Sequence, residues 1–147
     1  MKLSWFIIVF ICGAMLPLQT GFNSKLGKSI ESPLYASLIC FVVGALAMAF
    51  YIPFTKETIT WTGLKSASLF SWIGGGLLGA CYITATMLEL PRIGMAVTFG
   101  LVVAGQVCIA VISDHFGIMV TQQHSFNIWR LLGILFIISG VNIVQKF

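Results

Sequence analysis

Four polar side chains that could bind a small molecule lie within or beside long apolar runs of this sequence. Gln19 and Asn23 are four residues apart and follow closely after Pro17, so a helix would place both amides on one face. Tyr82 and Gln106 lie in two later apolar runs. A polar group inside an apolar span costs free energy unless it is paired or solvated. These four residues are therefore the candidate substrate-binding residues.

Pro17 allows two interpretations of the first pair. Proline has no N–H group, so a helix through Pro17 leaves the carbonyl of Gly13 without its usual partner. A broken or kinked helix at this point would offer backbone and amide groups to a substrate. Alternatively, Gln19 and Asn23 form hydrogen bonds between helices, which are common in membrane bundles. The sequence leaves both interpretations open.

One carboxylate lies close to an apolar run. Tyr82, Thr86 and Glu89 fall at positions i, i+4 and i+7, so they share a helix face. Glu89 is a candidate proton or cation coupling site. Arg92 follows three residues later, and the spacing favours an ion pair between Glu89 and Arg92 at the level of the lipid headgroups.

Patterns typical of enzymes and metal centres are missing from the sequence. His115 and His124 are nine residues apart and have no cysteine or glutamate at ligand spacing. The sequence contains no nucleophile elbow, phosphate-binding loop or metal-binding His-Glu pair. We therefore expect no enzyme activity, no metal site and no cofactor. The cysteines form no close pairs and read as small buried hydrophobic residues: Cys12, Cys40, Cys81 and Cys108.

The composition indicates an integral membrane protein. Hydrophobic residues make up 59% of the chain and charged residues 8%, and the mean hydropathy is +1.03. A soluble domain has roughly a quarter of its residues charged, so this chain cannot cover a water-facing surface. The net charge of +4 is too small to indicate nucleic acid. The lipid bilayer is the expected partner.

Five apolar segments are long enough to cross a bilayer, which takes about 20 residues. They must be helical, because an open sheet would leave backbone groups unsatisfied in lipid. We therefore predict an all-α bundle in one transmembrane domain covering residues 1–147, with spans at about 4–21, 33–54, 70–88, 93–113 and 128–144. The first segment resembles a signal peptide but lacks a cleavage site, so we expect it to stay as a span.

The links between the spans are short, except for the polar segment 114–127. Ser32-Pro33 and Pro91 are expected at helix ends. The third and fourth spans are separated only by residues 89–92, which predicts a tight antiparallel hairpin. Small residues four apart, such as Ala36, Cys40 and Gly44, form a stripe that would allow helices to approach closely.

Orientation in the membrane usually follows the lysines and arginines, which favour the cytoplasmic side. With five spans the two sides carry four such residues each: Lys2, Lys56, Lys65 and Arg130 against Lys25, Lys28, Arg92 and Lys146. Either one loop dominates, or the chain inserts both ways up and pairs with an inverted copy of itself.

Several motifs resemble those of the small bacterial YdcZ-type family in the drug/metabolite transporter (DMT) superfamily. The longest is GAMLPLQTGFN at 13–23. It is followed, in family order, by Ser32-Pro33, FVVG at 41–44, GGGLLG at 74–79 with Tyr82, PRIG at 91–94, VVAGQ at 102–106, DHFG at 114–117 and LG at 132–133. The resemblance covers nearly the whole chain. Glu89 is not part of it, which weakens a shared coupling role for that residue.

The resemblance implies a bacterial inner-membrane location and a transport function. Larger DMT members have ten helices in two halves of opposite orientation, so this chain looks like one half and a working unit would resemble an antiparallel homodimer. In inverted repeats the substrate lies near the bilayer midplane, and Gln19, Asn23, Tyr82 and Gln106 match polar positions of the family.

Three functions are compatible with these observations. The first is a secondary transporter of a small metabolite or drug-like molecule, working by alternating access, with proton or sodium coupling left open. The second is a non-transporting membrane subunit that needs a paralogous partner chain or assists assembly. The third is a channel, although the sequence has no ring of like charges to build a selectivity filter. The charge of the substrate and the direction of transport are not fixed by the sequence.

Overall fold

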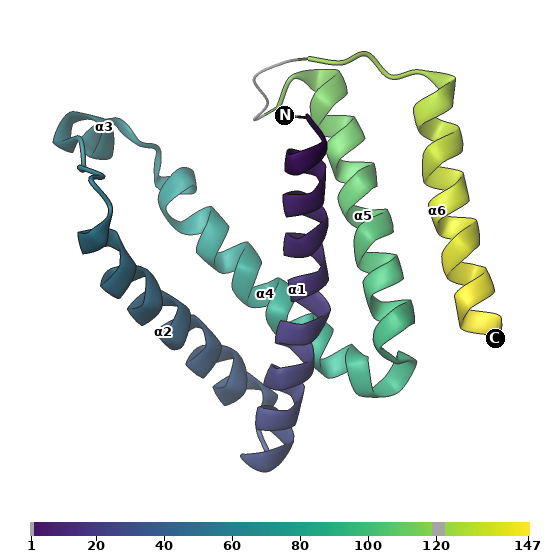
Figure 1. Ribbon diagram of the computed structural model, residues 1–147, viewed down its shortest axis with the longest axis horizontal. Helices are drawn as coiled ribbons and strands as arrows, with labels where there is room; N and C mark the ends of the chain where they lie inside the picture. Colours follow the sequence, from purple (N-terminus) through teal and green to yellow (C-terminus); the bar gives the residue numbers. More distant parts are fainter. Residues whose placement is uncertain (1, 119–122) are drawn as a thin grey trace. The chain divides into compact units, whose positions relative to one another are not determined.

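The computed structural model describes residues 2–118 and 123–147, and these residues form helices and connecting turns without a strand (Figure 1). Five helices are long and apolar enough to cross a membrane, which confirms the predicted all-α membrane fold. The elements are α1 (Lys2–Ser29), α2 (Pro33–Tyr51), the 3₁₀ turn η1 (Ile52–Phe54), α3 (Trp61–Ser66), α4 (Leu69–Ile93), α5 (Met95–Phe116) and α6 (Ile128–Lys146).

Helix α1 is longer than the sequence predicts. It continues through Pro17 and on to Ser29, so the helix is not broken at Pro17. A proline removes one backbone hydrogen bond, and the rest of a long helix holds the segment together. Most residues from 22 to 29 are polar but compatible with a helix, and Lys28 lies in the last turn, where a cation is favourable.

The link between α4 and α5 is shorter than predicted. Pro91 lies inside α4, which ends at Ile93, and Gly94 alone separates it from α5. The backbone of Gly94 has a φ of 80°, a conformation that residues with a Cβ rarely adopt. Residues 89–92 are therefore helical, and the antiparallel hairpin stays a prediction.

Side-chain caps fix the starts of two spans. The Ser32 hydroxyl accepts a hydrogen bond from the Tyr35 N–H group, and Pro33 occupies the first turn of α2, as the sequence predicts. The Asn127 side chain accepts one from the Arg130 N–H group at 2.9 Å. Each cap satisfies a backbone donor that has no partner inside its helix.

The chain divides into two compact units, Met1–Glu89 and Leu90–Phe147. In the first unit α1 and α2 pack against each other around Gly27. A Cβ atom on Gly27 would lie 3.3 Å from the Met87 methyl carbon of α4 and 3.6 Å from the Ala36 Cβ of α2. Both Ala36 and Met87 are buried, so three helices meet at this glycine.

In the second unit α5 and α6 pack closely. A Cβ atom on Gly100 would lie 2.7 Å from the Val141 Cγ2 atom, so the glycine is what allows this approach. At one end of the pair the Arg130 guanidinium donates to the Asp114 carboxylate at 2.9 Å. The predicted polar link 114–127 includes residues 119–122, which lie outside the described part; residues 123–127 are exposed.

Most apolar side chains of the described residues are exposed to their surroundings; those that are buried and hydrophobic are Ala36, Met87, Phe99, Ala104 and Val141. Helices in lipid need no hydrophobic core of their own, because lipid tails are as apolar as their side chains. The close helix contacts at Gly27 and Gly100 each use a glycine, and the remaining surface suits hydrocarbon.

Replacing Gly100 with alanine should weaken the pairing of α5 and α6. The added methyl group meets Val141 at a distance that real Cβ atoms do not show, and overpacking of this kind costs about 1–3 kcal/mol. The melting temperature of the purified protein in detergent measures the effect. Gly105→Ala is the control, since its Cβ would meet nothing within 4 Å. Adding Val141→Ala to Gly100→Ala should restore the lost stability; equal melting temperatures for the two single variants would contradict the contact.

Candidate functional site

The first unit contains a groove of about 400 Å³ that three helices line. Its lining residues are Gln19 of α1, Ile83 of α4, and Cys40, Phe41, Gly44, Ala45 and Met48 of α2. A volume of this size is within the range of small-molecule sites, which are mostly apolar and contain a few placed polar groups. The groove is the candidate functional site.

The spacing of residues on α2 produces the groove. Cys40, Gly44 and Met48 are four residues apart, so they follow one another along a single helix face. Gly44 has no side chain, and a Cβ atom placed there would meet nothing within 4 Å. A small residue in the middle of the row, with larger side chains beside it, leaves the hollow.

Gln19 supplies the polar group of the groove. Its Nε2 atom donates a hydrogen bond to the Cys40 Sγ atom at 3.3 Å. A primary amide has two N–H donors and a carbonyl oxygen with two lone pairs, and a thiol sulfur is only a weak acceptor. The amide can therefore bind a ligand group while it keeps its hydrogen bond to the Cys40 sulfur, or it can replace the sulfur with a stronger acceptor.

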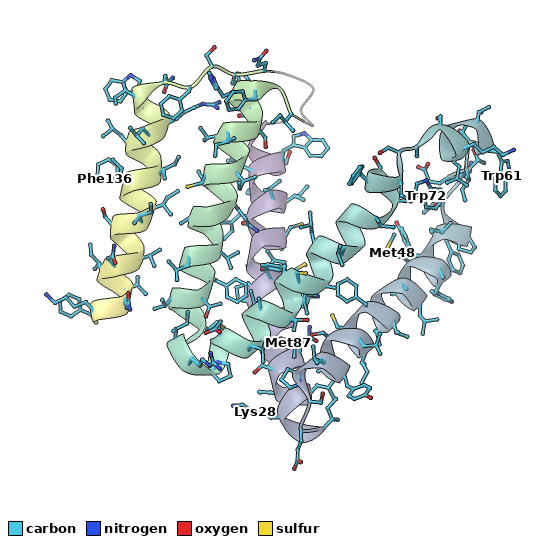
Figure 2. All side chains as sticks on the ribbon, turned by 180° about the vertical axis from the view of Figure 1, so that it is seen from behind. Lys28, Met48, Trp61, Trp72, Met87 and Phe136 are labelled. Atoms are coloured by element: carbon cyan, nitrogen blue, oxygen red, sulfur yellow. The ribbon has the colours of Figure 1, made fainter. Side chains whose placement is uncertain are left out.

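A chain of hydrogen bonds joins α2 to α4 in the same unit. The Thr84 hydroxyl donates to the Ser37 hydroxyl at 3.3 Å, and the Ser37 hydroxyl lies 3.0 Å from the Pro33 carbonyl oxygen and 3.4 Å from the Met87 Sδ atom. Ser37 has one hydrogen to donate, so it bonds to one of these two acceptors at a time. Figure 2 shows Met87 near Lys28, toward the end where α1 meets α2, and Met48 farther along α2.

Two other predicted binding residues belong to the same unit. The Asn23 Nδ2 atom and the Tyr82 hydroxyl are buried and have no hydrogen-bond partner among the described residues. Leaving a buried polar group unpaired costs about 1–3 kcal/mol. Unpaired buried groups are rare in native proteins, so each of these two needs an explanation. Neither residue is among those that line the groove.

The remaining predicted residues lie elsewhere. Gln106 is on α5 in the second unit, where its side chain is exposed. Glu89 and Arg92 lie in the last turns of α4, both exposed, and each has an interaction partner. Of the four candidate binding residues, the structure places Gln19 on the groove and leaves the roles of Asn23, Tyr82 and Gln106 as predictions.

No lysine, arginine, aspartate, glutamate or histidine is among the residues that line the groove. Among the described residues, no three potential metal ligands come together. His115 has a structural contact, because its Nδ1 atom accepts a hydrogen bond from the Phe126 N–H group at 3.2 Å. The groove could therefore hold a ligand through its shape and hydrogen bonds, because its lining has no charged side chain.

Sequence reasoning missed the apolar walls of the groove. Phe41, Met48 and Ile83 look like any other membrane-facing residues in the sequence, because lipid-facing and groove-facing side chains are equally apolar. The stripe of Ala36, Cys40 and Gly44 was the available signal, since Cys40 and Gly44 of this stripe line the groove.

Comparison with known proteins gives a family for most of the chain. Residues 4–143 match a family described as "Putative inner membrane exporter, YdcZ". Searches of curated proteins and of solved structures find no match. The match agrees with the resemblance seen in the sequence motifs and with the five membrane-spanning helices.

Filling the groove at Gly44 should protect the Cys40 thiol. In a variant whose other three cysteines are alanine, Gly44→Leu should slow the alkylation of Cys40 by N-ethylmaleimide several-fold, because the new side chain occupies the space beside the thiol. Gly74→Leu on α4 is the matched control, since Gly74 also has nothing within 4 Å of its Cβ position and does not line the groove. The same alkylation rate in both variants would contradict the groove.

Proposed function

We propose that this chain, which belongs to the family described as "Putative inner membrane exporter, YdcZ", is a secondary transporter of small metabolites or drug-like molecules. The groove of the first unit forms part of its substrate site, with Gln19 as a binding residue. Asn23, Tyr82 and Gln106 are proposed as further polar contacts. The protein works as an inverted homodimer by alternating access, and its substrate leaves the cell.

The proposal is supported mainly by a mostly apolar groove, with a single amide on its wall, in a chain whose family is described as "Putative inner membrane exporter, YdcZ". Gly44 and Ile83 lie near the middle of α2 and α4. In a helix that crosses the bilayer these positions are close to the midplane, where transporters with inverted repeats bind their substrates.

The balance of positive charge supports the inverted dimer. Lysines and arginines are divided equally between the two membrane sides, four and four, so the usual charge bias gives no preferred orientation. A chain that inserts both ways up can pair with its own inverted copy. Such a pair would have ten spans from two five-span chains, which supplies the second half that alternating access requires.

Purified protein reconstituted alone into liposomes should transport. With an efflux substrate found by screening cells for resistance, we expect saturable flux that Gly44→Leu and Gln106→Ala both reduce at least ten-fold, while Gly74→Leu keeps it near the unaltered level. Crosslinking checks that Gln106→Ala still forms the dimer. Flux that is absent until a paralogous chain is added would replace the proposal with a non-transporting subunit, and flux without saturation would indicate a channel.

The orientation of the chain tests the dimer independently. A cysteine added after Phe147, in a variant without the four native cysteines, should be labelled by a membrane-impermeant reagent in roughly half of the molecules in intact cells, because the charge bias is zero. Permeabilised cells give the total. Labelling of nearly all or nearly none of the molecules would mean a single orientation, and would rule out the inverted homodimer.

A further inference from the structure

We infer that the groove of the first unit selects an uncharged, mainly apolar molecule that carries one hydrogen-bonding group, such as a carboxamide or a hydroxyl. The inference rests on the proposed function, in which this groove belongs to the substrate site. It goes further because neither the family nor the sequence fixes the charge of the substrate.

The groove has no charged side chain that could bind an ion. The residues that line the groove include no cationic or anionic side chain. The nearest charged positions along the helices are at their ends: Lys25 and Lys28 on α1, and Glu89 on α4. An ion that leaves water for an apolar site loses its hydration and needs a countercharge in return. The groove has none to offer, so a cation or an anion would bind weakly.

Depth strengthens this argument. Helix α2 lines the groove from Cys40 to Met48 with Gly44 at the centre, and α4 contributes Ile83 from its middle part. Trp61 in α3 and Trp72 near the start of α4 lie together at one end of the first unit, and Lys28 lies toward the other end (Figure 2). Tryptophan and lysine are typical of the two bilayer interfaces. The groove is between them, in the hydrocarbon, where charge is most costly.

The Gln19 amide decides which neutral molecules fit. Its hydrogen bond to the Cys40 sulfur is a weak one, and a carbonyl or hydroxyl oxygen is a better acceptor for the same N–H group. A bare hydrocarbon chain has no such atom, so the tail of a lipid would leave the amide poorly paired. The groove therefore favours a molecule with a polar group over a lipid tail.

The apolar walls of the groove suit a ligand whose apolar part is flexible or aromatic. Met48 has an unbranched, polarizable side chain that adapts to different shapes, and the Phe41 ring offers an apolar surface that packs well against other rings. Ile83 completes the apolar surface from α4. A volume of about 400 Å³ holds a molecule of about the size of a phenylbutyl group with a small head.

Four probes that share this skeleton test the inference. They are phenylbutanamide (neutral and polar), phenylbutylammonium (a cation), phenylbutanoate (an anion) and butylbenzene (neutral without a polar group). The readout is protection of Cys40 from N-ethylmaleimide in the full chain whose other cysteines are alanine, purified in detergent at neutral pH. We expect phenylbutanamide to protect at a concentration at least ten-fold lower than either ion requires. It should also protect at a concentration about five-fold lower than butylbenzene requires, the value of one hydrogen bond.

Two glutamine variants provide the matched comparison. Gln19→Leu should remove the advantage of phenylbutanamide over butylbenzene, whereas Gln145→Leu should keep it, because Gln145 is exposed near the end of α6. Loss of the advantage in both variants, or in neither, would overturn the role of Gln19.

The outcomes separate this inference from the proposed function. Equal or stronger protection by an ion overturns the neutral class even if liposomes transport. Equal protection by butylbenzene means a site for lipid tails and overturns the inference as well, as does the absence of protection by any probe. Protection by phenylbutanamide with no transport in liposomes supports the inference about the groove and counts against the transporter.

Discussion

Backbone groups that enter the hydrocarbon of a bilayer have no water to bond with, and this constraint shapes the rest of the molecule. It requires each span to be a helix that satisfies its own N–H and C=O groups. Side chains are then free to be apolar on nearly all sides, as in α2 and α5. The capping side chains of Ser32 and Asn127 lie at helix starts, where the first backbone donors have no partner within the helix.

Because water does not drive these helices together, close contact depends on the absence of side chains. Gly100 lets Val141 reach the backbone of α5, and Gly27 lets Met87 and Ala36 approach α1. Gly44 has the same lack of a side chain but no atom within 4 Å of its Cβ position. Glycine therefore forms a close contact where a neighbouring helix places a side chain against it, and leaves a hollow where no side chain is near.

The sequence predicts features that depend on local composition and misses those that depend on tertiary contacts. The spans could be predicted because a run of apolar residues carries its own signal. The end of α1 could not, since residues 22–29 are polar enough to look like a loop and yet continue the helix. Pro91 was expected to end α4, but a proline in the last turn loses only one hydrogen bond. Gln19 stood out as a polar residue in an apolar run, whereas Phe41, Met48 and Ile83 could be assigned to the groove only from the tertiary contacts.

Two buried polar atoms of the first unit lack hydrogen bonds within the described part of the chain, which costs folding free energy. The Asn23 Nδ2 atom and the Tyr82 hydroxyl are buried without a hydrogen-bond partner among the described residues, although phenylalanine in place of Tyr82 would carry no such cost. A nearby hydroxyl pair, Thr84 and Ser37, is fully engaged. Local packing can therefore satisfy polar side chains in this unit. Under the proposed function, Asn23 and Tyr82 gain their partners in the working state, from a bound molecule or from a second copy of the chain. Either source would make their cost a driving force for that state.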